Sequence, residues 1–280
     1  MQRTFEPGSP ERLYIDLLKA CVSRAAFGPG WRRVTFRKRS PLRALWAPLA
    51  KALGSRSIEL VQRVEADPSL REQGRDVPFD ADTMLGQARL QHLVDCCIDV
   101  LRDDVPGDFI ETGVWRGGAC ILMRGALAAA GDRARRVWVA DSFQGLPPPD
   151  PDKYPADAGD LHHVEEQLRV TADEVRERFA RYGLLDDQVR FLQGWFKDTL
   201  PGAPIERLAI ARLDGDMYES TMDAITALYP KLSVGGWLIV DDYGAVEGCK
   251  KAIADYRAQH DIREPIVEID WTGAAWRRAR

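Results

Sequence analysis

The chain has 280 residues and a formal net charge of −4 at pH 7, and 45% of its residues are hydrophobic and 29% charged. These values are ordinary for a soluble globular protein with one large domain or two small ones, and they give no reason to expect nucleic acid as a partner. No apolar run approaches the roughly 20 residues of a membrane span, and the start has no apolar segment typical of a secretory signal. The five cysteines are odd in number and lack CxxC spacing, so we expect a reducing, cytoplasmic environment.

Residues 1–75 differ from the remainder, and we expect them to form an N-terminal helical cap with a basic insertion. Apolar spacing predicts a helix over 13–25. A basic segment follows, with no acidic residue between Trp31 and Ser57. It has two interpretations: a surface for anionic lipid or an acidic partner, or a solvated insertion whose arginines lie over a few apolar groups.

From residue 76 to 280 the pattern alternates regularly between strand and helix. We expect helices over 82–104, 117–131, 171–182, 220–236 and 247–259. We expect strands over 105–114, 136–143, 188–193, 207–213, 237–241, 265–270 and 274–278. A long loop rich in Pro, Asp and Gly occupies 145–163. The alternation predicts an α/β fold with a doubly wound, largely parallel sheet and an antiparallel edge at its C-terminal end.

Paired aspartates follow two of the expected strands. Asp214 and Asp216 end one apolar run, and Asp241 and Asp242 end the next. Parallel strands bring such residues to the carboxyl edge of the sheet, where open α/β folds bind ligands. Carboxylates that converge repel one another, and a hard divalent cation such as Mg²⁺ or Ca²⁺ relieves that repulsion. The alternative is that some of these acids cap helices or lie solvated in turns.

The sequence ETGVWRGG at 111–118 predicts a strand that ends in glycines before a helix, which lets the backbone approach a ligand closely. It is not the GxGxxG dinucleotide motif. Asp141 ends the next strand, where an acid commonly binds ribose hydroxyls. Together these features suggest S-adenosylmethionine. The structural alternative is a tight turn with a capping aspartate.

At these residues the chain resembles the macrocin O-methyltransferase family. The matching stretches are 83–90, 105–118, 137–147, 181–201, 211–225, 229–245 and 269–278, and 13–19 is similar to the family's start. The resemblance implies a class I S-adenosylmethionine-dependent methyltransferase fold, Rossmann-like, with a seven-stranded sheet. It implies a Mg²⁺-dependent enzyme that methylates a deoxysugar hydroxyl on a macrolide or related glycosylated natural product, or on a nucleotide-bound sugar. It also implies a homo-oligomer.

The resemblance assigns roles to individual residues. Asp214, Asp241 and Asp242 would bind the metal, and Asp216 would act as general base. The residues expected at the cofactor are Thr83, Met84, Glu111, Thr112, Gly113, Asp141, Ser142, Gly194, Trp195 and Phe196. From its place at the end of the long loop, His162 is a further catalytic candidate that could reach the acceptor or serve as an alternative base. The other interpretation of His162 is a solvated loop histidine.

Two other functions remain open from the sequence alone. Nucleotide-sugar glycosyltransferases also use a D-x-D motif with a divalent ion, and Asp214–Gly215–Asp216 fits that pattern. A diphosphate site should bring basic residues close, however, and only Arg212 is near the motif. The third possibility is a non-catalytic Rossmann-like binding module with a vestigial acidic cluster.

Overall fold

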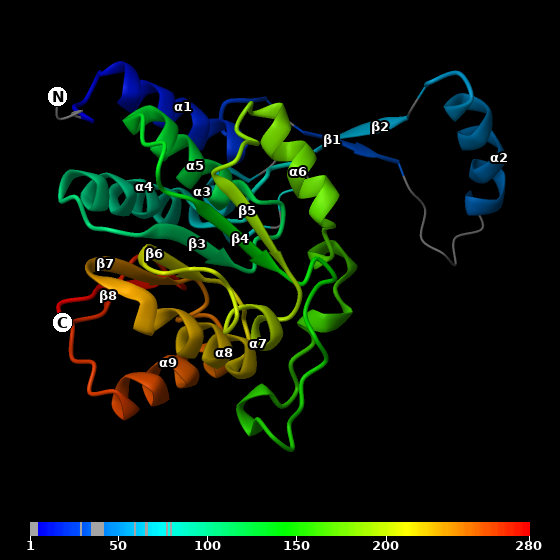
Figure 1. Cartoon of the computed structure of the whole chain (residues 1–280). Coiled ribbons are helices and arrows are strands. Elements are labelled where there is room, and N and C mark those ends of the chain that lie inside the picture. Colours follow the sequence, from blue (N-terminus) through cyan, green and yellow to red (C-terminus); the bar gives the residue numbers. More distant parts are fainter. Residues whose placement is uncertain are drawn as a thin grey trace.

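The computed structural model describes residues 5–28, 30–34, 42–58, 60–64, 67–76, 78 and 80–280. A seven-stranded sheet forms its centre, with the strand order β5-β4-β3-β6-β7-β9-β8 (Figure 1). The strands are β3 (Asp108–Thr112), β4 (Val137–Asp141), β5 (Val189–Gln193), β6 (Leu208–Leu213), β7 (Leu232–Val240), β8 (Val267–Glu268) and β9 (Ala274–Arg277). Strands β3 to β7 are parallel, and β9 pairs antiparallel with β7 and β8. The predicted doubly wound α/β sheet with an antiparallel end is therefore confirmed.

Helices cover both faces of the sheet (Figure 1). One face packs against α4 (Gln87–Arg102), α5 (Gly118–Ala130) and α6 (Ala172–Arg181), and α1 (Pro10–Val22) packs on α5. The other face packs against α8 (Tyr218–Leu228) and α9 (Glu247–Gln259), with the short α7 (Phe196–Thr199) beside α8. Among the described residues, no helix has the length and apolarity to cross a membrane.

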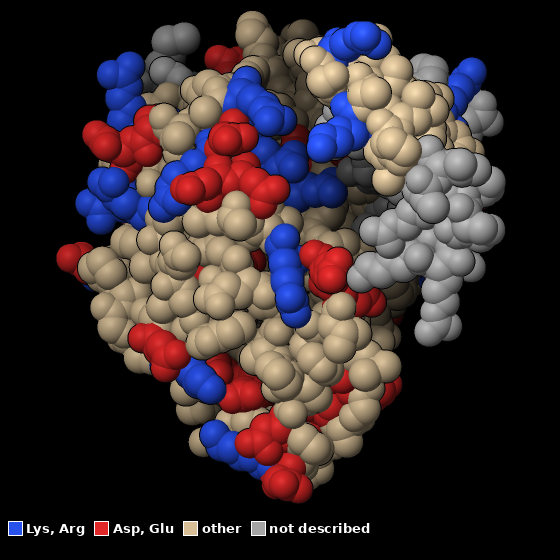
Figure 2. Space-filling model, turned by 90° about the vertical axis from the view of Figure 1, so that its right-hand side faces the viewer, with Lys and Arg blue, Asp and Glu red and all other residues tan. Residues whose placement is uncertain are grey.

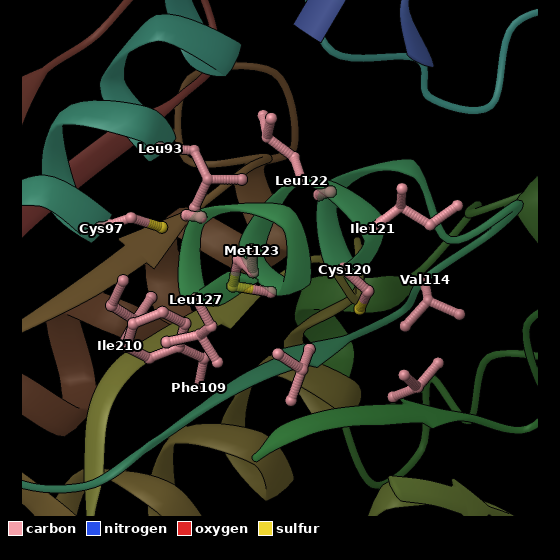
Figure 3. Packing of buried hydrophobic residues seen from close by; sticks show 14 of the residues in the cluster. Leu93, Cys97, Phe109, Val114, Cys120, Ile121, Leu122, Met123, Leu127 and Ile210 are labelled. Atoms are coloured by element: carbon pink, nitrogen blue, oxygen red, sulfur yellow. The ribbon is translucent and has the colours of Figure 1, made fainter. Parts of the chain in front are cut away.

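Alternation along the strands divides the core between these two faces. In β3, Phe109 contributes to the core on the α4 and α5 side, and the next residue, Ile110, contributes to the core under α8 and α9. Figure 3 shows the first of these cores, where Leu93 and Cys97 of α4 and Met123 and Leu127 of α5 gather over Phe109. A parallel sheet covered on both faces needs apolar residues at every strand position, which explains the continuous apolar runs in the sequence.

The N-terminal part adds a small two-stranded unit. Strands β1 (Gly30–Arg33) and β2 (Val61–Val64) pair antiparallel, and α2 (Leu42–Gly54) lies between them in the sequence. Figure 1 shows this unit projecting to one side of the large sheet. The short helix α3 (Pro68–Gln73) then leads into α4. Residues 35–41, in the middle of the basic segment, lie outside the described residues.

The expected helix over 220–236 is wrong in its second half. Helix α8 ends at Leu228, a single 3₁₀ turn (η4, Tyr229–Lys231) follows, and β7 begins at Leu232. Pro230 has no N–H to donate and therefore cannot continue the α-helical ladder. The glycine pair that suggested a helix end lies inside β7, where Gly235 has a φ of 84° and the register with β6 shifts. It is a bulge in the strand.

Candidate active site

Three carboxylates meet at the carboxyl edge of the sheet. Asp214 follows β6, Asp216 lies in the turn after it, and Asp242 follows β7. One oxygen from each lies within 4.8 Å of the others. β6 and β7 are adjacent and pair Leu213 with Val240, so their ends reach the same place. The predicted convergence of Asp214, Asp216 and Asp242 is thus present in the structure.

The turn after β6, which carries Asp214 and Asp216, has an unusual backbone conformation at Asp216. Asp216 has a φ of 57°, and its N–H donates to Asp242 Oδ2 over 3.3 Å. A left-handed conformation is uncommon for a residue other than glycine, although aspartate tolerates it better than most, and such conformations concentrate at functional sites. It places the Asp216 backbone against the second acidic pair.

Burial and mutual repulsion raise the pKa values of this group. Burial and the nearby Asp214 raise the pKa of Asp216 to about 7. Burial and Asp241 raise the pKa of Asp214 to about 6, and burial and Asp216 raise that of Asp242 well above its ordinary value. Three carboxylates so close together cannot all be ionised at low cost without a cation.

Asp241 is placed differently from the other three acids. Its Oδ2 accepts from Arg89 Nη1 over 2.5 Å, and its Oδ1 accepts from Arg212 Nη2. These pairs hold its pKa below the usual value in spite of burial. The expected metal ligand Asp241 therefore lies outside the group within 4.8 Å, because both of its oxygens face arginines. Each oxygen keeps a second lone pair.

The two arginines are the functional residues that sequence reasoning missed. Arg212 is 1% exposed, and its Nη1 also donates to Glu111 over 2.5 Å and to Asp214 over 2.7 Å. Arg89, on α4, bridges Asp241 and Asp270. The signal for Arg212 was a lone cation in an otherwise apolar strand, which is unfavourable without buried anionic partners. Nothing local distinguished Arg89 from a solvated helix arginine.

A cavity of about 300 Å³ opens directly beside the carboxylates. Its lining includes the acids Asp214 and Asp216 and the aromatic residues Trp115, Trp195 and Phe196. Six of the expected cofactor residues line it, namely Met84, Gly113, Asp141, Ser142, Trp195 and Phe196. The other four, Thr83, Glu111, Thr112 and Gly194, are not part of its lining.

Glu111 and Thr112 are buried and do not line the cavity. Glu111 is 2% exposed, accepts from Cys120 Sγ over 2.9 Å and pairs with Arg212. Burial raises its pKa to about 7, although Arg212 opposes the shift. Thr112 is fully buried in β3, and Thr83 is buried with its hydroxyl accepting from the N–H of Leu85.

Asp141 ends β4 at the wall of the cavity, and its carboxylate already organises the backbone there. Oδ2 accepts from the N–H of Val114 over 2.8 Å, and Oδ1 accepts from the N–H of Phe143 over 2.7 Å. Burial raises its pKa, and these backbone hydrogen bonds counteract the shift. Asp141 thus binds the turns after β3 and β4, although it does not cap α5, which has no side-chain cap, and a ribose would have to use its remaining lone pairs.

The loop after β4 brings His162 to the same edge. His162 Nδ1 lies 2.7 Å from Asp160 Oδ2, and its backbone N–H donates to Asp160 Oδ1 over 2.9 Å. Burial lowers the pKa of His162, but Asp216 and Asp160 outweigh burial and raise it overall. His162 thus interacts electrostatically with Asp216. It is not a purely solvated loop residue, because Asp160 orients its ring.

Charges of both signs surround this edge. Figure 2 shows, among the described residues of the face turned toward the viewer, Lys and Arg interspersed with Asp and Glu. Lys197 lines the cavity, and its Nζ lies 3.6 Å from Glu219 Oε1.

Comparison with known proteins finds O-methyltransferases by both a family model and individual relatives. The model of the family Macrocin-O-methyltransferase (TylF) matches residues 11–278. Demethyldecarbamoylnovobiocin O-methyltransferase of Streptomyces niveus is 55% identical over 215 residues, which are 75% of this chain and 81% of that protein. Mycinamicin III 3''-O-methyltransferase of Micromonospora griseorubida is 55% identical over 212 residues, or 75% of this chain and 83% of that protein.

Solved structures show the same fold. The O-methyltransferase NovP is similar with a TM-score of 0.82 and 46% identity, covering 96% of this chain and 100% of NovP. The calicheamicin methyltransferase CalS11 has a TM-score of 0.55 and 18% identity, covering 90% of this chain and 98% of CalS11, and so supports the fold alone. The expected class I methyltransferase fold is confirmed.

Proposed function

The chain is an O-methyltransferase that belongs to the macrocin O-methyltransferase family, and from this premise we propose that it transfers the methyl group of S-adenosylmethionine to a sugar hydroxyl of a glycosylated natural product, with the help of Mg²⁺. The relatives above are named for novobiocin and mycinamicin compounds. The observation that carries the proposal is the group Asp214, Asp216 and Asp242, of which Asp214 and Asp216 line an aromatic cavity.

The residues present fit a divalent cation. The group offers carboxylate oxygens, which Mg²⁺ and Ca²⁺ prefer. Burial and, after it, mutual repulsion raise its pKa values, and a cation would relieve both costs of ionisation. We propose Asp214 and Asp242 as ligands, with Asp241 as a third through the lone pairs that its arginines leave free. Arg89 and Arg212 would then fix the orientation of Asp241, as supporting hydrogen bonds commonly do for metal ligands.

The cavity also fits S-adenosylmethionine. A volume of about 300 Å³ lies within the range of small-molecule sites. Trp195 and Phe196 offer flat faces for a purine ring. Asp141 and Ser142, at the end of β4, lie where ribose hydroxyls bind in related folds. When bound, the cofactor would supply an activated methyl group and the cation would make the acceptor hydroxyl more acidic.

The protein's own part in the reaction is to orient the acceptor and to take its proton. Asp216 lines the cavity, and its raised pKa makes it a better base than an ordinary aspartate. The His162 ring, which Asp160 orients, lies in the same electrostatic environment as Asp216, and we propose that it contacts the acceptor. Orientation of this kind can contribute about 7–11 kcal/mol to lowering a barrier.

The charges near the D-x-D motif argue against the glycosyltransferase alternative. A nucleotide diphosphate needs accessible basic groups near the D-x-D motif. Arg212, the cation nearest the motif in the sequence, is 1% exposed and already paired with Glu111, Asp214 and Asp241. It is therefore not part of the cavity's lining, and Lys197, the cation of that lining, lies with its Nζ 3.6 Å from Glu219 Oε1.

The test is a methylation assay with S-adenosylmethionine, Mg²⁺ and a panel of glycosylated natural products and nucleotide sugars, read by mass spectrometry. We expect one added methyl group on a sugar hydroxyl. The Asp216→Asn enzyme should bind Mg²⁺ normally but turn over about 10²–10⁴ times more slowly, which is the usual contribution of a general base. Unchanged turnover in Asp216→Asn would remove it as the base, and stabilisation of the protein by nucleotide sugars alone would overturn the proposed activity.

We further propose a homo-oligomer in a reducing compartment. Leu13 and Leu17 on α1 are 59% and 60% exposed, which is costly for a monomer and suits contact with a second copy. All five cysteines are free. Light scattering coupled to gel filtration measures the mass directly, and a mass of one chain would contradict the oligomer.

A further inference from the structure

Asp157 holds the middle of the loop between β4 and α6 against the start of α8. Its Oδ1 accepts from the N–H of Tyr218 over 2.6 Å, and its Oδ2 accepts from the N–H of Glu219 over 3.1 Å. The first N–H groups of a helix have no partner within the helix. The N-cap residue Met217 offers no side-chain cap, so Asp157, 61 positions earlier in the chain than Tyr218, satisfies these groups instead.

The contact is buried and closely packed. Asp157 is 3% exposed and ends a short 3₁₀ turn (η1, Pro155–Asp157) within the loop. Gly248, near the start of α9, lies beneath it, and a Cβ at that position would lie 2.7 Å from Asp157 Oδ1. The Tyr154 ring lies 5.9 Å from that of Tyr218. The segment around Asp157 is therefore seated between the starts of α8 and α9.

The two ends of the same loop are fixed by other contacts. At the start, Ser142 Oγ donates to the carbonyl of Gly145 over 2.7 Å. At the end, Trp115 Nε1 donates to the carbonyl of Gln167 over 2.9 Å. These ends contribute Gly145 and Leu168 to the cavity wall, beside Ser142. Losing Asp157 would therefore release the middle of the loop and leave its ends in place.

The middle of the loop carries groups suited to a glycosylated acceptor. Asp160 and His162 form a pair near Asp216. Leu161 and Val164, on either side of the histidines, are 66% and 59% exposed and offer apolar surface. A sugar hydroxyl attached to an apolar aglycone would meet both kinds of group here.

We propose that Asp157 is a positioning residue that docks the middle of the 145–168 loop onto α8 and thereby sets the affinity for the acceptor. This proposal rests on the proposed methyl-transfer function. α8 begins two residues after Asp216, so the same contact fixes the loop relative to the proposed base. Asp157 itself touches backbone N–H groups and not the reacting atoms.

The test compares Asp157→Ala, Asp157→Asn and the matched control Asp150→Ala. Asp150 is an exposed aspartate of the same loop, and its side chain accepts from the nearby N–H of Lys153 over 3.2 Å. In Asp157→Ala we expect the acceptor KM to rise about tenfold or more, because two charge-assisted hydrogen bonds are lost. We expect kcat and the Kd for S-adenosylhomocysteine to change by less than about threefold, since the ends of the loop stay fixed.

Asp157→Asn should restore part of the affinity, because its amide oxygen can still accept one N–H. Hydrogen exchange provides a readout that does not depend on activity: the amides of Tyr218 and Glu219 should exchange faster in Asp157→Ala than in Asp150→Ala. Faster exchange with an unchanged acceptor KM would overturn the role in acceptor binding, and unchanged exchange would overturn the docking contact. If the wild-type enzyme methylates no sugar, the proposed function fails, while the exchange result still decides whether Asp157 docks the loop.

Discussion

Arg89 Nη1 donates to Asp241 Oδ2 over 2.5 Å and so joins helix α4 to the residue that follows strand β7, 152 positions later in the chain. Both residues are 7% exposed. The same guanidinium also donates to Asp270 over 3.0 Å. One buried cation therefore ties α4, β7 and the loop before β9 together behind the carboxylate group.

We expect Arg89→Met to destabilise the protein by about 3–5 kcal/mol, because it leaves the buried carboxylate of Asp241 with one arginine in place of two. Urea unfolding followed by circular dichroism measures this. The matched control is Arg102→Met on the same helix, whose side chain is 59% exposed and pairs with Asp99 and Asp103 at the surface. The control should cost less than about 1 kcal/mol. If the two variants lost the same free energy of unfolding, the buried Arg89–Asp241 pair would stabilise the protein no more than the surface pairs of Arg102 do.

The sequence was sufficient to predict most of the fold, for a physical reason. Strands such as 208–213 are apolar at nearly every position because both faces of a parallel sheet are covered, and the aspartates after them had to lie at its carboxyl edge. The position of Asp214 and Asp242 followed from this geometry. The partners of Asp241 did not, since Arg89 reaches it from a helix far away in the sequence, and helix arginines are mostly solvated.

The same limit applies to the loop and to the cofactor residues. Asp157 is one of several acids in a Pro- and Asp-rich segment, and only the fold shows that it caps α8. Glu111 was expected at the cofactor because it lies in the ETGVWRGG motif. Glu111 lies within β3, whereas Gly113 lies just past the end of that strand at Thr112, so the two residues of one motif occupy different places. Gly113 lines the cavity, and Glu111 points to Arg212 and Cys120.

Addition of Mg²⁺ should raise the melting temperature of the wild-type protein, and Asp242→Asn should abolish the increase. Binding at a concentration 100 times the Kd stabilises a folded protein by about 2.7 kcal/mol, which is a shift of a few degrees for a domain of this size. Differential scanning fluorimetry with Mg²⁺ and with EDTA measures the shift. EDTA should also stop methyl transfer.

The control for this experiment is Asp223→Asn. Asp223 also lines the cavity, and burial raises its pKa to about 6, but it does not belong to the group within 4.8 Å. It should keep the full Mg²⁺-dependent shift. A wild-type protein that neither gains stability with Mg²⁺ nor loses activity in EDTA would rule out the cation.

The buried Glu111 should make stability fall as pH rises toward neutrality. Burial raises its pKa from 4.5 to about 7, so the native state holds a proton that the unfolded chain releases. The free energy of unfolding therefore decreases between about pH 4.5 and 7. Glu111→Gln removes this pH-dependent contribution. The free energy of unfolding of Glu111→Gln should therefore rise, relative to that of the wild type, by up to about 3 kcal/mol between pH 5 and 8. Urea unfolding across this pH range measures it, and exposed Glu268→Gln is the control. Parallel pH profiles for Glu111→Gln and wild type would contradict the assignment.

Gly113 sets how closely β3 and β6 approach at the site. Its φ is 83°, and a Cβ there would lie 1.7 Å from the backbone oxygen of Asp214. Gly183, after α6, has a similar φ of 67°, but a Cβ at that position would meet no atom within 4 Å. The two positions therefore share backbone strain and differ only in the space available, which makes Gly183→Ala a matched control for Gly113→Ala.

Gly183→Ala should cost about 1 kcal/mol, the usual penalty of a left-handed conformation for a residue with a Cβ. Gly113→Ala should lower the free energy of unfolding by several kcal/mol more than Gly183→Ala does, because backbone atoms rather than a flexible side chain must move. The movement would displace Asp214, so the Mg²⁺-dependent thermal shift should shrink in Gly113→Ala and persist in Gly183→Ala. Similar stabilities and similar Mg²⁺ responses for the two variants would mean that β3 and β6 can separate at the site without disturbing Asp214. The close approach of the two strands would then have no part in holding the carboxylates together.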